Sequence, residues 1–371
     1  MRQKPSGLTV EDFEAIRADI ITRYTSADDD ELAEHVWDAT RNRLILDAAA
    51  RESAKIQAQQ QLSLNNQKAV NGLDFIVNRP VHTPLWGDGG SILWARGQGT
   101  LLVGPQGVGK STVAQRLILA RIGVTQPSLF QHSVMVDERP VLYLAMDRPD
   151  QISDSMARMV DTSNADVADI VKRRFLVWEG HPPFKADMDP ERFADFVANE
   201  GNGPGAVIFD SVKDMMSNVV SDESGLAFNE TVQRILANGT DTLGNHHQRK
   251  GTAQNSKPDT LSDVYGSAWI TSGQGSIILL WGEAGARTVE MKHLKPIRIP
   301  VGPLTVNYDH ASGNATGGND RTLLLELASQ RRDSGFTIDE AVLKIRNTTR
   351  VDPTWRKDRQ AVDRVLKKLV D

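Results

Sequence analysis

Short apolar runs alternate with helix-patterned segments between residue 100 and about residue 307. This alternation is typical of an α/β domain built on a largely parallel sheet. The segment 240–245 departs from the pattern, because it is more polar than a central parallel strand normally is. The expected strands are 100–103, 141–145, 175–178, 206–209, a weak strand near Leu243, 276–281, 288–292 and 304–308.

The chain before this domain has a different pattern. Residues 1–70 are polar and helix-patterned, and neither glycine nor proline interrupts them between Asp30 and Lys68. The stretch 48–61 holds few large apolar side chains, so a helix there has little apolar surface to bury in a core of its own. Residues 1–70 are therefore expected to form a helical extension, either solvated or packed on a partner.

The chain after the α/β domain begins with a predicted linker at 309–320, which is rich in Gly, Asn and Ser. From Lys344 onward there are nine Lys and Arg against four Asp. Short helices that end in a basic one are typical of a helix-turn-helix or winged-helix module, although a charged helical tail that docks on its own α/β domain fits equally well. The three expected helices are 321–331, 337–345 and 354–370. The expected domains are 1–70, 71–310 and 321–371.

Composition narrows the class of protein. With 371 residues, 39% of them hydrophobic and 25% charged, the chain has the composition of a water-soluble globular protein. No apolar run approaches a membrane span and the polar start has no signal-peptide core, so we expect a cytoplasmic protein without a membrane partner. The absence of cysteine excludes disulfides and thiolate metal sites. A net charge of −5 argues against a protein coated in nucleic acid, but it permits a local basic site.

A phosphate-binding motif follows the first expected strand. Residues 104–111 read G-P-Q-G-V-G-K-S, directly after an apolar run and directly before a helix-patterned segment. In this pattern backbone N–H groups and a helix N-terminus hold a polyphosphate, Lys110 reaches the β- and γ-phosphates, and the Ser111 hydroxyl binds Mg²⁺. The residues expected around the nucleotide are Gly104, Pro105, Gln106, Gly107, Val108, Gly109, Lys110, Ser111 and Thr112.

Two carboxylates end apolar strands in the positions that hydrolysis of a nucleotide requires. Asp210 follows the run 206–209 and is the expected partner of the metal ion. Ser211 comes next and cannot act as the base, so the base is expected from elsewhere. Asp147 ends the run 141–146 and is the candidate, with a turn or helix-cap aspartate as the alternative. The chain has no N-K-x-D signature of guanine binding, which favours ATP with Mg²⁺ as the nucleotide.

Four further blocks resemble the RecA-like ATPase core of the DnaB and RepA hexameric helicases, most closely those that phages of actinobacteria encode. The resemblance extends over about residues 75–310. The blocks are Asp147 to Met159, the His246-His-Gln-Arg-Lys250 segment, Leu261 to Ser267 with the strand 275–281, and Lys292 to Arg298 with Gly302-Pro303. One departure concerns the base, because the shorter Asp147 stands where DnaB has a glutamate.

The resemblance implies roles for several of these residues. His247 would sense the γ-phosphate and relay its state to a DNA-binding loop, whereas a zinc site for the two histidines would need a third ligand that the sequence does not offer. Lys295 and Arg298 would enter the active site of a neighbouring subunit. The loop 249–263 carries Arg249, Lys250 and Lys257 but no aromatic residue, so it suits contacts with a DNA backbone, or else it is an ordinary surface loop.

The expected protein is thus a ring-forming DNA helicase, with a hexamer as the expected ring, that couples ATP hydrolysis to movement on single-stranded DNA. A primase or a helicase loader is a further expected partner. The first alternative is a DNA-stimulated ATPase that acts as a loader, recombination mediator or regulator without unwinding. The second is a DNA-binding regulator with a nucleotide switch. Trp86, Trp94, Trp269 and Trp281 are expected in core or interface packing rather than in base stacking.

Overall fold

The computed structural model describes residues 10–24, 34–41, 71–78, 81–249, 258, 260–318, 320–332, 334–346 and 350–370. The chain divides into two compact units, Met1–Val81 and His82–Asp371. In the first unit lie α1 (Val10–Tyr24), a helical stretch at 34–41 and the short α3 (Gly72–Val77). The stretch 48–61 lies outside the described residues.

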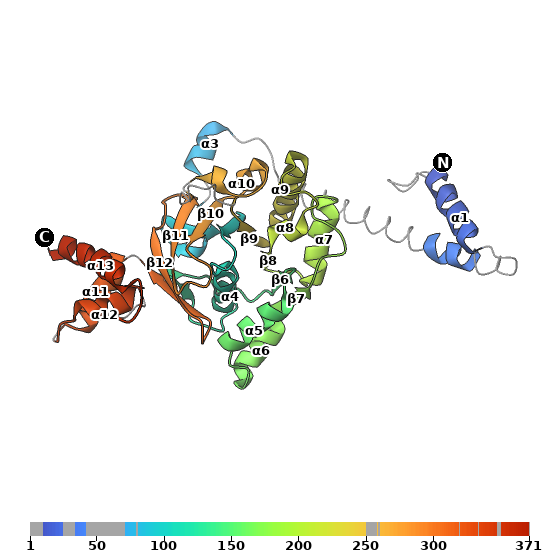
Figure 1. Cartoon of the computed structure of the whole chain (residues 1–371). Coiled ribbons are helices and arrows are strands. Elements are labelled where there is room, and N and C mark those ends of the chain that lie inside the picture. The colour runs from blue at the N-terminus through green and yellow to red at the C-terminus, as the bar shows by residue number, and fades with distance from the viewer. Residues whose placement is uncertain are drawn as a thin grey trace. The chain divides into compact units, whose positions relative to one another are not determined.

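The second unit is organised around a nine-stranded sheet, counted over the described residues, with the order β13-β12-β11-β10-β3-β9-β8-β6-β7 (Figure 1). The strands from β10 to β7 are mutually parallel, and β11, β12 and β13 continue the sheet in antiparallel pairing. The bounds are β3 (Thr100–Gly104), β6 (Val141–Ala145), β7 (Phe175–Glu179), β8 (Ala206–Asp210), β9 (Asp241–His247), β10 (Ser276–Trp281), β11 (Thr288–Lys295), β12 (Leu304–Asp309) and β13 (Asn314–Gly318). The predicted α/β fold with a largely parallel sheet is confirmed.

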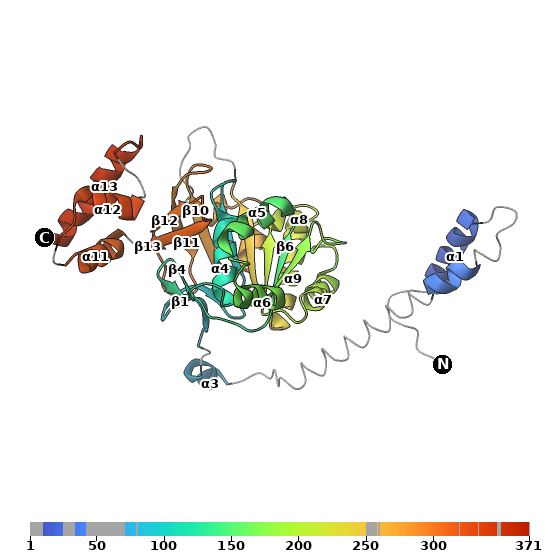
Figure 2. The same cartoon turned by 90° about the horizontal axis from the view of Figure 1, so that it is seen from below.

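Helices cover both faces of the sheet, which Figure 1 and Figure 2 show from two directions. One apolar cluster joins the sheet to α4 (Lys110–Arg121), α5 (Pro149–Met159) and α6 (Ala165–Arg174). A second joins the other face to α7 (Pro190–Glu200), α8 (Val212–Met215), α9 (Asp222–Ala237) and α10 (Ala268–Ser272). Because both faces are covered, the parallel strands from β10 to β6 are almost entirely buried, as such sheets require, whereas the edge strand β7 is only partly covered.

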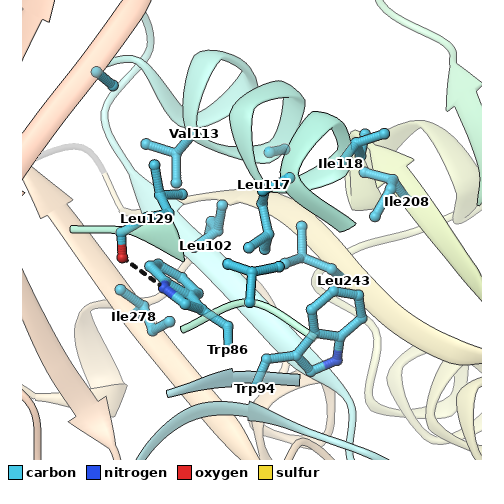
Figure 3. Close-up of a cluster of buried hydrophobic side chains, with 14 of the residues drawn as sticks. Trp86, Trp94, Leu102, Val113, Leu117, Ile118, Leu129, Ile208, Leu243 and Ile278 are labelled. Carbon is cyan, nitrogen blue, oxygen red and sulfur yellow. Dashed lines mark hydrogen bonds between the residues drawn. The ribbon is translucent and has the colours of Figure 1, made fainter. Parts of the chain in front are cut away.

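A hairpin that the sequence pattern did not predict closes the first cluster. It consists of β1 (Pro84–Asp88) and β2 (Ser91–Ala95), and each strand contributes one buried tryptophan, Trp86 and Trp94. Figure 3 shows both rings beneath Val113 and Leu117 of α4, with the Trp86 indole N–H donating to the Leu129 carbonyl at 3.0 Å. The short strands β4 (Ser128–Leu129) and β5 (His132–Ser133) pair with each other, and β5 contacts β1. Packing is thus the role of Trp86 and Trp94, as expected.

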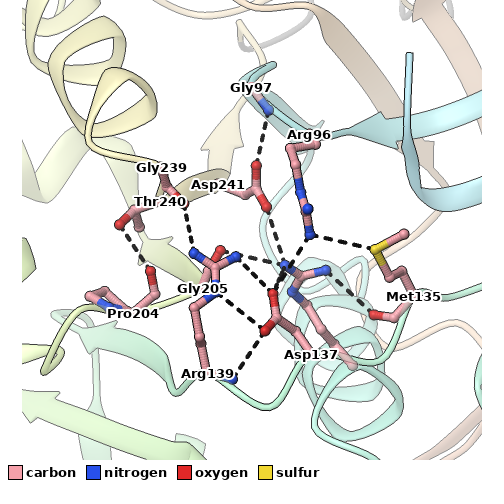
Figure 4. Close-up of polar contacts among 11 residues, drawn as sticks. Arg96, Gly97, Met135, Asp137, Arg139, Pro204, Gly205, Gly239, Thr240 and Asp241 are labelled. Atoms are coloured by element: carbon pink, nitrogen blue, oxygen red, sulfur yellow. Dashed lines mark hydrogen bonds and ion pairs between the residues drawn. The ribbon is translucent and has the colours of Figure 1, made fainter. Parts of the chain in front are cut away.

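The polar segment 240–245 forms a central, buried strand, in place of the weak strand expected near Leu243. Asp241 accepts a hydrogen bond from the Gly97 N–H and pairs with the Arg121 guanidinium at 3.2 Å, and both side chains are at most 3% exposed. Figure 4 shows Asp241, Asp137 and Arg139 in the same polar cluster. The Arg121 guanidinium and the Gly97 N–H thus compensate the buried charge of Asp241, and β9 can therefore occupy the middle of the sheet.

The predicted linker 309–320 is also corrected, because Asn314–Gly318 forms β13 and pairs with β12. Glycine is needed there, since a Cβ on Gly317 would lie 2.9 Å from the Phe130 ring. The chain then forms the three expected helices, α11 (Asp320–Gln330), α12 (Ile338–Arg346) and α13 (Trp355–Val370). Leu323, Leu324, Leu327, Ala341, Val342, Ile345 and Val362 form a separate apolar core for these helices.

Candidate nucleotide site

The phosphate loop lies between the carboxyl end of β3 and the first residue of α4. Gly107 and Gly109 have φ values of 75° and 93°, in the left-handed region that favours glycine. At Gly109 a Cβ would also overlap the Tyr308 ring. These two glycines let the backbone turn tightly enough to present the N–H groups of the loop, and of the start of α4, to one cavity.

Lys110 is held close to the loop that precedes it. Its ammonium donates to the Gly104 carbonyl at 3.0 Å and to the Pro105 carbonyl at 2.7 Å, and the residue is 8% exposed. Burial lowers the pKa of Lys110 to about 8, although the charge of Asp210 opposes this shift. A polyphosphate would supply the negative charge that this buried cation lacks, which is what a phosphate-binding lysine requires.

Strand register brings the other candidate residues to the same edge of the sheet. Gly104 pairs with His247, Asn245 pairs with Asp210, and Asp210 pairs with Ala145, two residues before Asp147. Lys110, Ser111, Asp147, Asp210 and His247 line one cavity of about 370 Å³, which we call the nucleotide cavity. The sequence predicted these residues from separate motifs, and the structure brings them together.

Asp210 and Ser111 offer oxygen ligands of the kind that Mg²⁺ prefers. Asp210 is 6% exposed, and one of its oxygens accepts a 2.5 Å hydrogen bond from the buried Tyr143 hydroxyl. Burial, followed by the Asp210 charge, raises the pKa of Tyr143 well above its ordinary value, so the phenol remains a donor. Ser111 and Asp210 together suit Mg²⁺, which takes few protein ligands and completes its coordination shell with water and phosphate oxygens. Tyr143 was not singled out by sequence reasoning, because it lies inside an apolar run.

Asp147 reaches the cavity from the loop between β6 and α5. Its backbone N–H donates to the Asp210 carbonyl at 3.3 Å, and its side chain is 44% exposed. Arg148, with φ of 53°, occupies the N-cap position of α5 and its side chain makes no cap hydrogen bond. The helix-cap alternative for Asp147 is therefore not what the structure shows. An exposed carboxylate at the cavity is accessible to the water that a base must activate.

The two histidines at the end of β9 have different surroundings. His246 is fully buried, its Nε2 lies 2.6 Å from the Tyr265 carbonyl, and burial lowers its pKa to about 4, so the ring is neutral. His247 is partly exposed, and burial, then the Lys110 charge, lowers its pKa. The described residues contain no group of three His, Cys, Asp or Glu side chains that could hold a metal ion, so a zinc site at the pair lacks support.

His247 also lines a second cavity of about 1360 Å³, which we call the loop cavity. Arg249, Tyr265 and Trp281 contribute to its wall. The backbone N–H of Arg249 donates to the Asp263 carbonyl at 2.8 Å, which fixes the base of the segment predicted to bind DNA. Lys250 and Lys257 lie outside the described residues. Trp269 is 44% exposed, so it is not in the core of this unit.

Lys295 and Arg298 lie far from the nucleotide cavity of their own chain. Lys295 pairs with Ile277, which in turn pairs with Leu101, three residues before the phosphate loop and about 10 Å from it along the strand. The Lys295 ammonium donates to the carbonyls of Thr271 and Ser272 at 3.1 and 2.9 Å, at the C-terminus of α10. Arg298 is exposed. Neither residue belongs to the cavity that the other candidates form.

The far wall of the nucleotide cavity comes from residues that sequence reasoning missed. Tyr308, Asp309 and His310 at the end of β12, with Gly313 and Asn314 at the start of β13, line it. Burial raises the pKa of Tyr308 well above its ordinary value, so this side chain is neutral. The interpretation of 309–320 as a linker concealed this wall. No local sequence motif indicates this wall, because it depends on the pairing of Asn314–Gly318 with β12.

Comparison with known proteins supports the identity of this domain. Residues 69–253, about half of the chain, match a protein-family model described as AAA domain. A search of curated proteins found no match to the chain. None of the described helices is long and apolar enough to cross a membrane. The phosphate loop, the carboxylates at the strand ends and this match together identify residues 69–253 as part of a P-loop ATPase domain of the RecA-like kind.

Proposed function

We propose that the protein is an ATP-driven DNA helicase of the DnaB/RepA-like type, which assembles into a ring and moves on single-stranded DNA. The observation that carries this proposal is the position of His247. This side chain lines the nucleotide cavity and also the loop cavity, where Arg249 begins the segment predicted to contact DNA. One side chain can therefore respond to the γ-phosphate and move the base of that segment.

The nucleotide cavity has the parts that phosphoryl transfer to water needs. Mg²⁺ would be held by Ser111 and Asp210 and would neutralise charge on the phosphate oxygens. Lys110 adds a cation next to the phosphate loop, and Asp147 would accept the proton of the attacking water. Hydrogen bonding by Tyr143 keeps the Asp210 carboxylate in one orientation. Among the described residues that line this cavity, Arg158 is the single arginine, so further positive charge would have to come from outside it.

A ring would supply that charge from another subunit. Lys295 lies about 10 Å from its own phosphate loop along the strand direction, and neither Lys295 nor Arg298 lines the nucleotide cavity of its own chain, so they would serve hydrolysis only across an interface. The described part of the first unit also exposes a group of large apolar side chains, which is typical of a protein–protein contact. These side chains are Leu73, Phe75, Ile76, Val77 and Val81.

The test of the DNA contact is ATP turnover with and without single-stranded DNA. Replacing Arg249→Glu together with Lys257→Glu should leave turnover without DNA nearly unchanged and should reduce the stimulation of turnover by DNA. The slope of DNA affinity against salt concentration should fall by about one to two units. Lys172→Glu with Arg173→Glu, an equal change of charge on the exposed end of α6, is the matched control. Equal effects of the two double variants would remove the DNA assignment from this segment.

Mixed rings test the action of Lys295 in trans. The Lys295→Ala protein keeps its phosphate loop, and the Lys110→Ala protein keeps Lys295. If the cation acts across an interface, mixing the two inactive proteins should restore part of the ATPase activity, because some interfaces then pair an intact loop with an intact lysine. Inactive mixtures in which mixed rings are demonstrated by mass would contradict the trans arrangement.

Strand displacement separates helicase activity from the alternative, a DNA-stimulated ATPase that acts as a loader, recombination mediator or regulator. A forked duplex with one labelled strand is incubated with the protein, Mg²⁺ and ATP, and release of that strand is measured. Release that requires hydrolysable ATP supports the helicase. DNA-stimulated turnover without release would support the alternative.

A further inference from the structure

We propose that the exposed face of α13 is a docking surface for the phosphate backbone of duplex DNA, in addition to the site for single-stranded DNA. With 3.6 residues per turn, five exposed basic side chains of α13 fall within an arc of about 120°. They are Arg356, Lys357, Arg364, Lys367 and Lys368. Asp363 pairs with Lys367 at 2.9 Å at the edge of this arc. We call this surface the basic face.

The opposite face of α13 is already used for folding. Val362 is fully buried, and Val365, Leu366 and Leu369 pack with it in the apolar core that α11, α12 and α13 share. The helix is therefore fixed on its module by one side and presents its cations on the other. The arrangement differs from the rest of the protein, because the whole chain carries a net charge of −5.

The module is firmly attached to the ATPase sheet. The Arg346 guanidinium, at the end of α12, donates to the Thr305 hydroxyl at 2.6 Å and to Asp320 at 2.8 Å. The Asn307 side-chain amide donates to the Ile345 carbonyl at 3.0 Å. This contact with the ATPase sheet uses one cation of the C-terminal segment, Arg346 at the end of α12. The five cations of the basic face are not used for it and remain exposed.

The chemistry of the basic face favours duplex DNA among polyanions. The arc from Arg356 to Lys368 carries no aromatic ring on which unpaired bases could stack, so its contacts would be to phosphates, which a duplex presents on two strands along one rigid axis. A membrane-binding helix needs a free apolar face, and that of α13 is buried. An α-helix of about 10–12 Å diameter fits the major groove of about 12 Å, and the basic face extends for about 18 Å along the axis, enough for several phosphates on both strands.

The test is binding of the full-length protein to a labelled 20-base-pair duplex, followed by fluorescence anisotropy at several salt concentrations. Arg364→Gln with Lys368→Gln removes two cations of the basic face, and glutamine keeps the helix propensity. Lys357 is left unchanged, because it also borders the loop cavity. If both replaced cations contact phosphates, the salt slope falls by about two units and duplex affinity at about 0.1 M salt falls on the order of 50-fold. Lys172→Gln with Arg173→Gln is the matched control and should change neither quantity.

A second variant, Arg356→Gln with Lys367→Gln, tests the same face at other positions in case the first one folds poorly. Stimulation of ATPase by single-stranded DNA should persist in both variants, which separates this inference from the proposed helicase site. Unchanged salt slopes would overturn the inference and leave a solvated face. An equal loss for an oligothymidine strand would overturn the choice of duplex. A changed oligomeric mass with intact duplex binding would instead assign the face to a second copy of the chain.

Discussion

Replacing Asp241→Asn should destabilise the ATPase unit far more than its small change in shape indicates. The Asp241 carboxylate lies 3.2 Å from the Arg121 guanidinium, and these side chains are 3% and 1% exposed. Removing one member of a buried pair typically costs about 3–5 kcal/mol, because the other charge stays buried without its partner. Two contacts moderate the loss: the introduced amide oxygen would still accept from the Gly97 N–H, and Asp137 remains 3.2 Å from Arg121. We therefore expect a loss of about 3 kcal/mol.

The measurement is thermal unfolding followed by tryptophan fluorescence, since the Arg121 guanidinium lies over the Trp94 ring at 5.3 Å. A loss of about 3 kcal/mol should lower Tm by roughly 6–10 °C in a unit of this size. Asp169→Asn is the control, because its pair with Arg173 is exposed and such pairs contribute at most about 1 kcal/mol. If Asp241→Asn lowers Tm no more than Asp169→Asn, the buried pair does not hold β9 in place.

The pKa values point to a further outcome for this pair. Burial raises the pKa of Asp241 and lowers the pKa of Arg121, in each case against the effect of the partner's charge. Desolvation therefore outweighs attraction for both groups. Replacing both at once, Arg121→Met with Asp241→Leu, should recover much of the stability that the single Asp241→Asn change loses. A double variant that is less stable than the single one would show that the attraction dominates.

Three more predictions concern the nucleotide cavity. Burial lowers the pKa of Lys110 to about 8, so ATP affinity in binding titrations should be constant below that pH and fall above it by up to about tenfold per pH unit. Lys110→Ala should abolish hydrolysis and remove this pH dependence of binding. Asp147→Asn should keep ATP bound and lower turnover by roughly 10²-fold, whereas normal turnover would exclude Asp147 as the base. Tyr143→Phe removes the hydrogen bond to Asp210 and should raise the Mg²⁺ concentration for half-maximal turnover by about tenfold, with Tm recorded to check folding; an unchanged Mg²⁺ dependence would contradict the positioning role.

Local patterns predicted most of the sheet but failed at two strands for identifiable reasons. The apolar runs at β6 and β10 have the predicted bounds, because buried parallel strands need apolar side chains on both faces. β9 is polar and still central, because Arg121, 120 residues away in sequence, pairs with Asp241. β13 is an edge strand whose two glycines make room for Phe130 and Gln131, and strand propensity does not detect such a segment.

The same contrast applies to the nucleotide cavity. The phosphate loop and the two aspartates are short motifs at strand ends, so sequence alone could nominate them. The wall formed by Tyr308 depends on a contact with Gly109, 199 residues earlier, where a Cβ would meet the Tyr308 ring. Only the topology of the sheet, with β12 and β13 continuing it beyond β11, brings the two segments together.

Strand β12 carries both a wall of the nucleotide cavity and the attachment of the C-terminal helices. Tyr308 and Asp309, at its end, line the cavity, and Thr305, near its start, accepts the hydrogen bond from Arg346. Thr305 and Tyr308 are three residues apart on the strand, so these attachments are separated by only about 10 Å. β12 thus connects the wall of the nucleotide cavity directly to the three C-terminal helices. We expect a displacement of these helices to shift that wall, so that a load on the module would change the rate of nucleotide exchange.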